Sequence, residues 1–135
     1  ITVIYVTHSI EEVIFLADQI ILLSEGKVVA QGTVEDIMSR IDLQSITGRL
    51  DAGAVIAAKY SRYDSEFDLG ELSFPGGTLR VSGFDELSGT PLRAHIRARD
   101  VSLMLDKPRN TSVLNVFRGK ITEVQAEDSK RQDEV

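Results

Sequence analysis

Residues 1–17 read ITVIYVTHSIEEVIFLA, and this stretch decides how the first part of the chain folds. Residues 1–6 are a continuous run of β-branched and aromatic side chains, which is typical of a strand buried on both faces of a parallel sheet. Ser9 and Glu12 have the S-x-x-E spacing of a capping box, which marks the beginning of a helix. The apolar side chains that follow recur at the spacing of one helical face: Ile10, Val13, Ile14 and Ala17. The stretch therefore predicts a buried strand, a turn through Thr7-His8 and an amphipathic helix.

Residues 20–41 predict a β-hairpin followed by a second short helix. The apolar runs 20–23 and 27–31 favour strands, and Glu25-Gly26 between them is a turn signal. Thr33 is suited to cap the helix that follows, because its hydroxyl can accept a hydrogen bond from a backbone N–H of the first turn. The apolar face predicted for that helix consists of Val34, Ile37, Met38 and Ile41.

The hydrophobic period changes from helical to alternating after a polar connection at residues 42–51. The strand candidates beyond it are 52–60, 67–74 with an interruption at Gly70, 78–82, 92–98 continued by the apolar positions of 101–105, and 115–125. Short strands separated by Gly and Pro turns favour a small barrel of OB type. The expected fold class is α+β. A short α/β segment, residues 1–47, precedes an all-β OB-like domain, residues 48–135, that is incomplete at its C-terminus.

The composition is that of an ordinary globular protein, with 135 residues, 42% apolar residues and 27% charged residues. The lack of cysteine excludes disulfides, Cys-ligated zinc and thiol nucleophiles, and His8 and His95 alone argue against a multi-histidine site. No metal site is therefore expected. No apolar run reaches the roughly 20 residues that span a bilayer. The chain opens with Ile1 inside an apolar run. We expect a fragment of a longer protein, the alternative being removal of an initiator Met or a tag.

Charge is distributed unevenly along the chain, whose formal net charge is −6. This acidity argues against broad binding to nucleic acid, so none is expected as a partner. Residues 93–120 carry seven bases against two acids, a net charge of +5, which leaves room for a small anion. Cationic side chains and a histidine alternate there with an apolar face, in the row Arg93, His95, Arg97 and Arg99. That row is either a solvated outer face or a contact surface for an anion or an acidic partner.

A second group of polar residues follows in the sequence Thr111-Ser112-Val113-Leu114-Asn115, with Arg118 and Lys120 shortly after. Hydroxyl and amide donors beside cations suit a compact dianion such as a tetrahedral oxometallate or sulfate. The same residues are also typical of an ordinary Ser/Asn turn that leads into a strand. The residue pattern alone leaves both interpretations open.

Five short segments occur in a fixed order near the N-terminus: VTHS (6–9), EEV (11–13), LAD (16–18), ILLSEGKV (21–28) and QGT (31–33). In this order residues 1–41 resemble the end of the ATP-binding domain of ABC transporters. The resemblance implies that His8 is the switch histidine, which reaches the γ-phosphate of ATP and the attacking water. The phosphate-binding loop, the signature motif and the acidic strand that holds Mg²⁺ do not occur in these residues. We therefore expect ATP and Mg²⁺ to bind in the parent subunit, and no ATPase activity from this chain alone.

Residues 97–103 (RARDVSL), 108–112 (PRNTS), Asn115 and 119–121 (GKI) carry a second resemblance. They resemble the C-terminal regulatory region of molybdate ABC transporter ATP-binding subunits, which has a TOBE/MOP-type OB-like fold. The resemblance implies that Ser112 and Asn115, with Lys120 as a weaker candidate, bind molybdate or tungstate. Members often have Arg just before that Asn, whereas this chain has Leu114, so one cationic contact is missing.

Taken together, the resemblances imply an energy-coupling subunit of a molybdate importer. Its expected partners are a second copy of itself, the membrane-spanning permease and a small oxyanion, and its expected location is peripheral, at the cytoplasmic face of the membrane. One alternative is a TOBE-bearing ATP-binding subunit for another cargo, such as sulfate, polyamine, iron or sugar. Another is a free-standing oxyanion-binding module.

Overall fold

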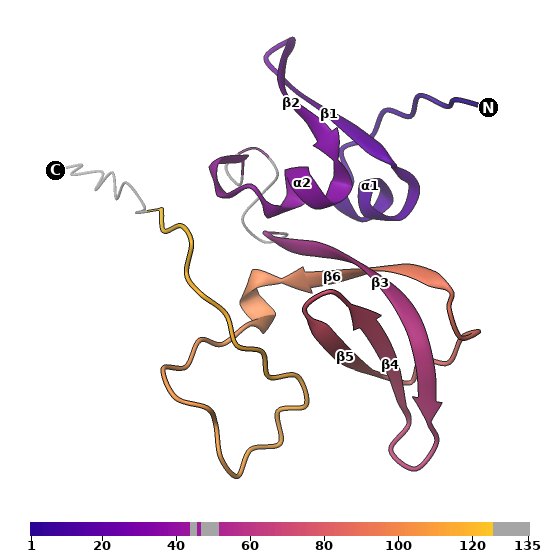
Figure 1. Ribbon diagram of the computed structural model, residues 1–135. Coiled ribbons are helices and arrows are strands. Elements are labelled where there is room, and N and C mark those ends of the chain that lie inside the picture. The colour runs from indigo at the N-terminus through magenta and orange to yellow at the C-terminus, as the bar shows by residue number, and fades with distance from the viewer. Residues whose placement is uncertain (44–45, 47–51, 126–135) are drawn as a thin grey trace, which may run out of the picture.

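The computed structural model of the chain describes residues 1–43, 46 and 52–125 (Figure 1). The first part contains α1 (Ile10–Leu16), β1 (Gln19–Ser24), β2 (Lys27–Thr33), α2 (Val34–Ser39) and the 3-10 turn η1 (Ile41–Leu43). The second part contains β3 (Gly53–Asp64), β4 (Leu69–Phe74), β5 (Gly77–Ser82), β6 (Pro91–Arg97) and the 3-10 turn η2 (Ala98–Asp100). This mixture of helices and antiparallel strands confirms the predicted α+β class.

Both helices begin at the residues that the sequence predicts as caps. The Ser9 hydroxyl accepts a hydrogen bond from the backbone N–H of Glu12 at 3.3 Å. The Thr33 hydroxyl accepts one from the backbone N–H of Asp36 at 3.2 Å. Each bond satisfies a backbone donor of the first turn that has no partner within the helix.

The predicted hairpin is present as the antiparallel pair β1–β2. Glu25 and Gly26 form its turn with φ values of +50° and +74°, which is the left-handed geometry that tight hairpin turns require. The pairing shifts register between Leu22 and Leu23. Such a bulge adds twist to a short ribbon.

The strands of the second part form an open antiparallel sheet in the order β5-β4-β3-β6. β3 is the long central strand, and it pairs with β6 through its first half and with β4 through its second half. The core on one side of this sheet is built from Ala58, Tyr60, Leu72 and Leu79. The predicted interruption at Gly70 is absent, because β4 continues through that residue.

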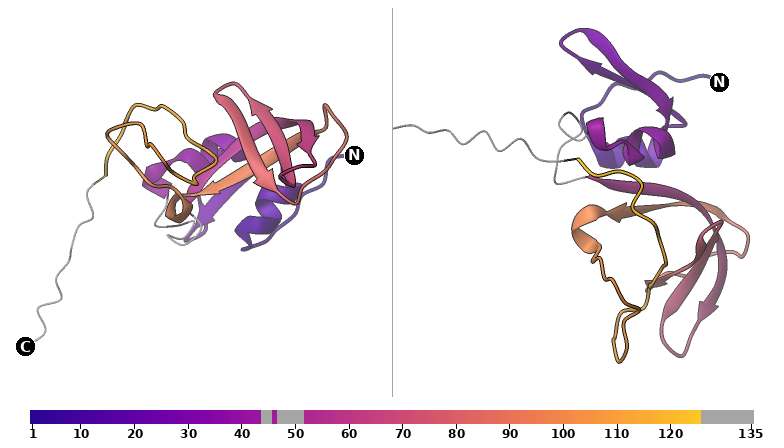
Figure 2. Two further views of the ribbon diagram at one scale, coloured as in Figure 1. Left: turned by 90° about the horizontal axis from the view of Figure 1, so that it is seen from below. Right: turned by 60° about the vertical axis from the view of Figure 1, so that its left-hand side comes forward.

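The helices of the first part pack against the β3–β6 side of the sheet (Figures 1 and 2). Ile14 of α1, Val34 and Met38 of α2 and Val55 of β3 form one buried cluster. Val34 is fully buried. Among the described residues, the two segments that the sequence predicts as separate therefore share one buried core. Residues 44–45 and 47–51, where the predicted domain boundary falls, lie outside the described residues.

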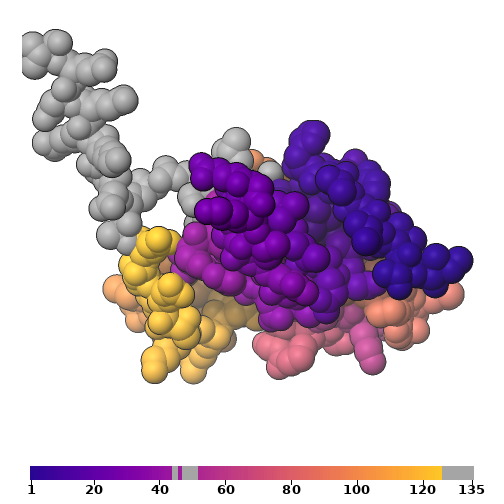
Figure 3. Space-filling model, turned by 90° about the horizontal axis from the view of Figure 1, so that it is seen from above, coloured from indigo at the N-terminus to yellow at the C-terminus, as the bar shows by residue number. Residues whose placement is uncertain are grey.

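The strand predicted at residues 1–6 is wrong. These residues have no regular secondary structure, and Ile1, Ile4 and Val6 are exposed to 122%, 91% and 89%. A buried parallel strand needs neighbouring strands on both sides and layers on both faces. Within the described residues no strand pairs with this segment. The N-terminal segment, in indigo, therefore lies on the surface (Figure 3).

The strands predicted at 101–105 and 115–125 are also wrong, because both stretches lack regular secondary structure. β6 ends at Arg97 and the chain turns away through η2. In the described part of the chain the sheet therefore stays open and does not close into the predicted barrel. The described residues also contain no helix long and apolar enough to cross a membrane.

Candidate functional site

His8 lies in the bend that precedes α1, and its side chain is exposed. Neighbouring hydroxyls fix this bend, because Thr7 and Tyr5 both donate to the carboxylate of Glu12, the latter at 3.2 Å. The Thr7 hydroxyl in turn accepts from the backbone N–H of Ser9 at 3.1 Å. The negative charge of Glu12 raises the pKa of Tyr5. The N-terminal end of α1 thus presents His8 to solvent on a hydrogen-bonded turn.

The capping box at this turn is only half formed. Ser9 caps the helix as predicted, but its own backbone N–H donates to Thr7 and not to Glu12. Glu12 is engaged by the hydroxyls of Thr7 and Tyr5 instead. The sequence spacing did not indicate this second role of Glu12.

Ser112, Asn115 and Lys120 lie on the irregular segment 101–125, and the structure does not gather them into one site. Ser112 and Lys120 are exposed, whereas Asn115 is half-buried. No hydrogen bond within the described residues joins these side chains to one another. His8 belongs to the other segment of the chain, ahead of α1.

The side chain of Asn115 is bound to the edge of the sheet. Its Oδ1 accepts from the backbone N–H of Arg80 at 2.8 Å, and its Nδ2 donates to the carbonyl of Arg80 at 2.9 Å. Arg80 belongs to β5, which is an edge strand. The amide of Asn115 therefore pairs with β5 as a neighbouring strand would. This structural role was not predicted from the sequence.

An aromatic contact holds the same segment in place two residues later. The rings of Phe117 and Phe74 pack edge to face with centroids 5.6 Å apart. Phe117 also lies over Gly77, where an added Cβ would come within 3.4 Å of the ring. Together with Asn115, this contact fixes the segment along the edge of β5.

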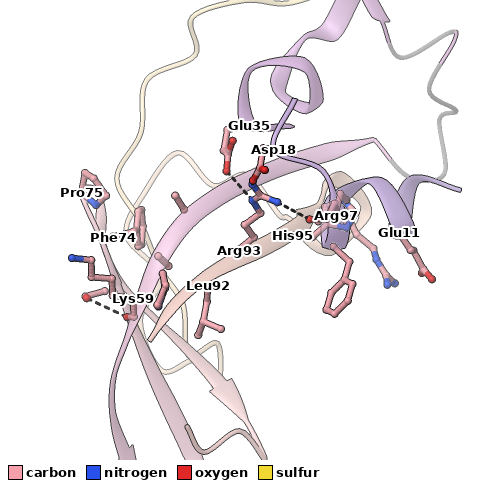
Figure 4. Close-up of a pocket in the computed structure, with 16 residues that line it drawn as sticks. Glu11, Asp18, Glu35, Lys59, Phe74, Pro75, Leu92, Arg93, His95 and Arg97 are labelled. Carbon is pink, nitrogen blue, oxygen red and sulfur yellow. Dashed lines mark hydrogen bonds and ion pairs between the residues drawn. The ribbon is translucent and has the colours of Figure 1, made fainter. Parts of the chain in front are cut away.

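The row of basic residues on β6 is not a solvated face along its whole length. Arg93 donates through Nη1 to the carbonyls of Ile14 at 3.2 Å and Ala17 at 2.7 Å. Its Nε lies 3.2 Å from a carboxylate oxygen of Glu35, and Asp18 lies 3.8 Å from Nη2. Arg93 therefore contacts an acidic partner, as one of the two predicted interpretations requires, but the partner lies in the same chain (Figure 4).

This contact supplies the positive charge that α1 lacks at its own C-terminal end. The last turn of α1 contains no basic residue. Helix C-termini carry carbonyls without partners and a partial negative charge, which a nearby cation stabilises. Arg93 of β6 fulfils this role from the sheet.

The other members of the row differ from Arg93. His95 is half-buried, and within the described residues its Nε2 is buried without a hydrogen-bond partner. Arg97 is half-buried at the end of β6, and Arg99 belongs to η2, beyond the strand. Arg93, His95 and Arg97 line a groove of about 1070 Å³ between α1 and the sheet, together with Phe15 and Phe74 (Figure 4).

A smaller hollow of about 700 Å³ lies on the loop segment, and it is lined by Asp106, Lys107, Pro108, Arg109 and Arg118. Sequence reasoning recognised these bases as part of a cationic block but did not group them. The sequence feature that could have grouped these bases is Lys107-Pro108-Arg109, with Arg118 nine residues after Arg109. In the described residues no group of three or more His, Cys, Asp or Glu side chains is arranged to hold a metal ion.

Comparison with known proteins gives relatives over nearly the whole chain. Neither a family model nor a solved structure matches it. The "Molybdenum import ATP-binding protein ModC" of Paramagnetospirillum magneticum is 41% identical over 127 residues, which cover 94% of this chain and 35% of that protein. The protein of the same name from Rhodospirillum rubrum is 40% identical over 121 residues, 90% of this chain and 33% of that protein.

"Molybdenum import ATP-binding protein ModC 1" of Azotobacter vinelandii is 39% identical over 129 residues, which cover 96% of this chain and 36% of that protein. The chain thus spans about a third of the length of the curated relatives it matches. The region of similarity includes both the segment with His8 and the β-sheet segment. The chain is therefore homologous, over nearly its whole length, to the C-terminal part of the molybdenum import ATP-binding proteins named ModC.

Proposed function

We propose that this chain forms the C-terminal part of the ATP-binding subunit of a molybdate import ABC transporter. The observation that carries the proposal is the similarity of about 40% identity to proteins named for molybdenum import, which runs through both segments. In this proposal the first segment completes the nucleotide-binding domain. The β-sheet segment is its regulatory, oxyanion-binding domain, and the boundary between them falls at residues 47 and 48.

His8 is the residue that we assign to the ATPase reaction. An imidazole at this place donates a hydrogen bond to the charge that develops on the γ-phosphate and orients the attacking water. Its exposure on the turn before α1, fixed by the contacts of Thr7 and Glu12, supports the assignment. Within the described residues, no group of three or more His, Cys, Asp or Glu side chains is arranged to hold Mg²⁺. The binding of ATP and Mg²⁺ is therefore assigned to the parent subunit.

The surface of the first segment supports the same proposal. Alongside the exposed N-terminal residues, large apolar side chains of α1 and the hairpin are exposed: Phe15, Leu16, Ile21, Leu23 and Val28. Many large apolar side chains exposed on one short segment are typical of a surface that is covered by other protein. The remainder of a nucleotide-binding domain suits this face. A second copy of the subunit, a permease partner and a peripheral location at the cytoplasmic face of the membrane follow from the proposed function.

A complementation experiment tests the proposal. Residues 1–135 replace the matching C-terminal segment in the ModC 1 protein of Azotobacter vinelandii, and uptake of labelled molybdate is measured in cells that lack the native subunit. We expect the chimera to restore uptake and the His8→Ala chimera to lose it, while Lys27→Ala, at an exposed hairpin position, retains it. A chimera that is made and reaches the membrane without importing molybdate would contradict the proposal. Import of sulfate in place of molybdate would favour the alternative cargo.

A further inference from the structure

The helix α1 is too short to hold its position by itself. It has seven residues and spans about 10 Å. Isolated helices shorter than about 12 residues are marginal in water, so contacts with other elements decide whether such a helix forms and where it lies. Ile14 of α1 is buried in the cluster that α1 shares with α2 and β3. Hydrogen bonds at the two ends of the helix add to this packing.

The N-terminal end of α1 is hydrogen-bonded to the turn that carries His8. Thr7, the residue before His8, donates its hydroxyl hydrogen to the carboxylate of Glu12. Ser9, the residue after His8, accepts a hydrogen bond from the backbone N–H of Glu12. Both neighbours of His8 are thus bound to the first turn of the helix. A tilt or shift of α1 therefore displaces the imidazole of His8 as well.

The C-terminal end of α1 is bound by one side chain of the sheet. Nη1 of Arg93 donates to the carbonyls of Ile14 at 3.2 Å and Ala17 at 2.7 Å. Nε of the same guanidinium lies 3.2 Å from the carboxylate of Glu35, which belongs to the first turn of α2 (Figure 4). One planar group thus joins β6, α1 and α2. Because its N–H donors have a fixed geometry, they restrict the direction of the helix end as well as its distance from the sheet.

We propose that Arg93 is a positioning residue for ATP hydrolysis, and that it acts by holding the helix that follows His8. The inference rests on the proposed function, in which His8 donates to the γ-phosphate. Arg93 acts through α1 and not on the substrate, because its donors are used on the carbonyls at the far end of that helix and on Glu35. A displacement of about 1 Å at a reacting group can cost about a hundredfold in rate. The β-sheet segment therefore contributes to the geometry of hydrolysis through the side chain of Arg93.

A purely structural role of Arg93 predicts a different kinetic result. A loss of stability lowers the number of folded subunits, but each folded subunit keeps its rate. A loss of positioning lowers the kcat of each folded site. It leaves the KM for ATP unchanged, because the phosphate-binding loop is assigned to the remainder of the parent subunit. The rate per folded site and its division between kcat and KM therefore distinguish the two roles.

The test measures ATP hydrolysis by the purified transporter that contains the Azotobacter vinelandii chimera. Folded sites are counted by the stoichiometry of a bound, non-hydrolysable ATP analogue. For Arg93→Met we expect kcat per site to fall about tenfold, with KM for ATP within about twofold of the unmodified chimera. Arg93→Lys should recover part of the loss, because an ammonium can still donate to the helix carbonyls. Arg62→Met is the matched control, because it removes a two-bond ion pair with Glu71 of β4 and should leave kcat per site unchanged.

A double-mutant cycle with His8 tests whether Arg93 acts through that residue. In the His8→Ala background, with residual hydrolysis followed in single turnovers of labelled ATP, Arg93→Met should change the rate per site by less than about twofold. An equal loss in both backgrounds would overturn the inference, as would an unchanged kcat in Arg93→Met or an equal loss in Arg62→Met. A chimera that neither hydrolyses ATP nor imports molybdate overturns the proposed function and the inference with it. An active chimera with an unaffected Arg93→Met variant overturns the inference alone.

Discussion

Replacing Arg93 by Met should loosen the contact between α1 and the sheet. Methionine keeps the apolar stem of the side chain and removes the guanidinium. The carbonyls of Ile14 and Ala17 would then lose their charged donor, and Glu35 would lose its partner. The side chain of Arg93 is 28% exposed, so water can replace part of the hydrogen bonding that the guanidinium provides.

The expected loss in the free energy of unfolding is estimated from the separate contacts of Arg93. The bond to Ala17 at 2.7 Å is short and charge-assisted, a type that contributes about 1.5–3 kcal/mol. The pair with Glu35 is partly exposed and adds about 0.5 kcal/mol, whereas the fully exposed Asp18 at 3.8 Å adds essentially nothing. Allowing for rehydration of the carbonyls, we expect a loss of about 2 kcal/mol in the free energy of unfolding.

Urea denaturation followed by circular dichroism measures this loss. With a slope of about 1–2 kcal/mol per molar urea, the midpoint should fall by about 1–2 M. Arg99→Met is the matched control, because Arg99 is exposed in η2 and forms no ion pair within the described residues. A loss below about 0.5 kcal/mol, or one equal to that of the control, would refute the assigned role of Arg93. Combining Arg93→Met with Glu35→Gln should give a coupling of about 0.5 kcal/mol.

Three further predictions concern the sheet and its edge. The hydrogen bond from Arg62 holds the pKa of Glu71 below its ordinary value of 4.5, so its contribution to stability is complete at neutral pH and is lost as pH falls through the lowered pKa. Glu71→Gln should accordingly flatten the decline of urea midpoints between pH 5 and pH 3, and an unchanged decline would contradict this. An added Cβ at Gly70 would lie 2.3 Å from a backbone oxygen of the neighbouring loop, so Gly70→Ala should cost about 2–4 kcal/mol in a thermal melt, whereas Gly119→Ala, with open space around it, should be neutral. Asn115→Ala should leave the β5 edge unpaired and produce concentration-dependent light scattering, and a clear solution at every concentration would count against the edge role.

The features predicted correctly from the sequence are those determined by nearby residues. The caps at Ser9 and Thr33 act within three residues, and the turn at Glu25-Gly26 needs only its own backbone geometry. The alternation from Leu92 to Arg97 likewise belongs to one strand, β6. For these elements the local pattern and the folded structure agree, because no distant partner competes with them.

The features that were predicted wrongly or not predicted at all depend on partners far away in the chain or outside the described residues. A β-rich run becomes a strand only where another strand accepts its hydrogen bonds, and residues 1–6 find no such strand in the described part of the chain. The partners of Arg93 lie 58 to 79 positions upstream. The hydrogen bonds between the Asn115 amide and a backbone 35 positions away were not predicted either, and the assignment of Asn115 as an oxyanion ligand stays a prediction. No periodicity in one sequence identifies such pairs.

The position of β6 has a consequence for the order in which the chain acquires its structure during synthesis. α1 and α2 emerge before the sheet, but their buried side chains pack against Val55 of β3, and the cation for the end of α1 comes from Arg93. The hairpins β3–β4 and β4–β5 connect neighbours in sequence, whereas β6 must return across both to pair with β3. Long-range pairing of this kind forms late. The contacts of α1 with Arg93 can therefore form only after residue 93 has left the ribosome. The geometry of the segment that carries His8 thus depends on β6, the last strand of the described sheet to be synthesised.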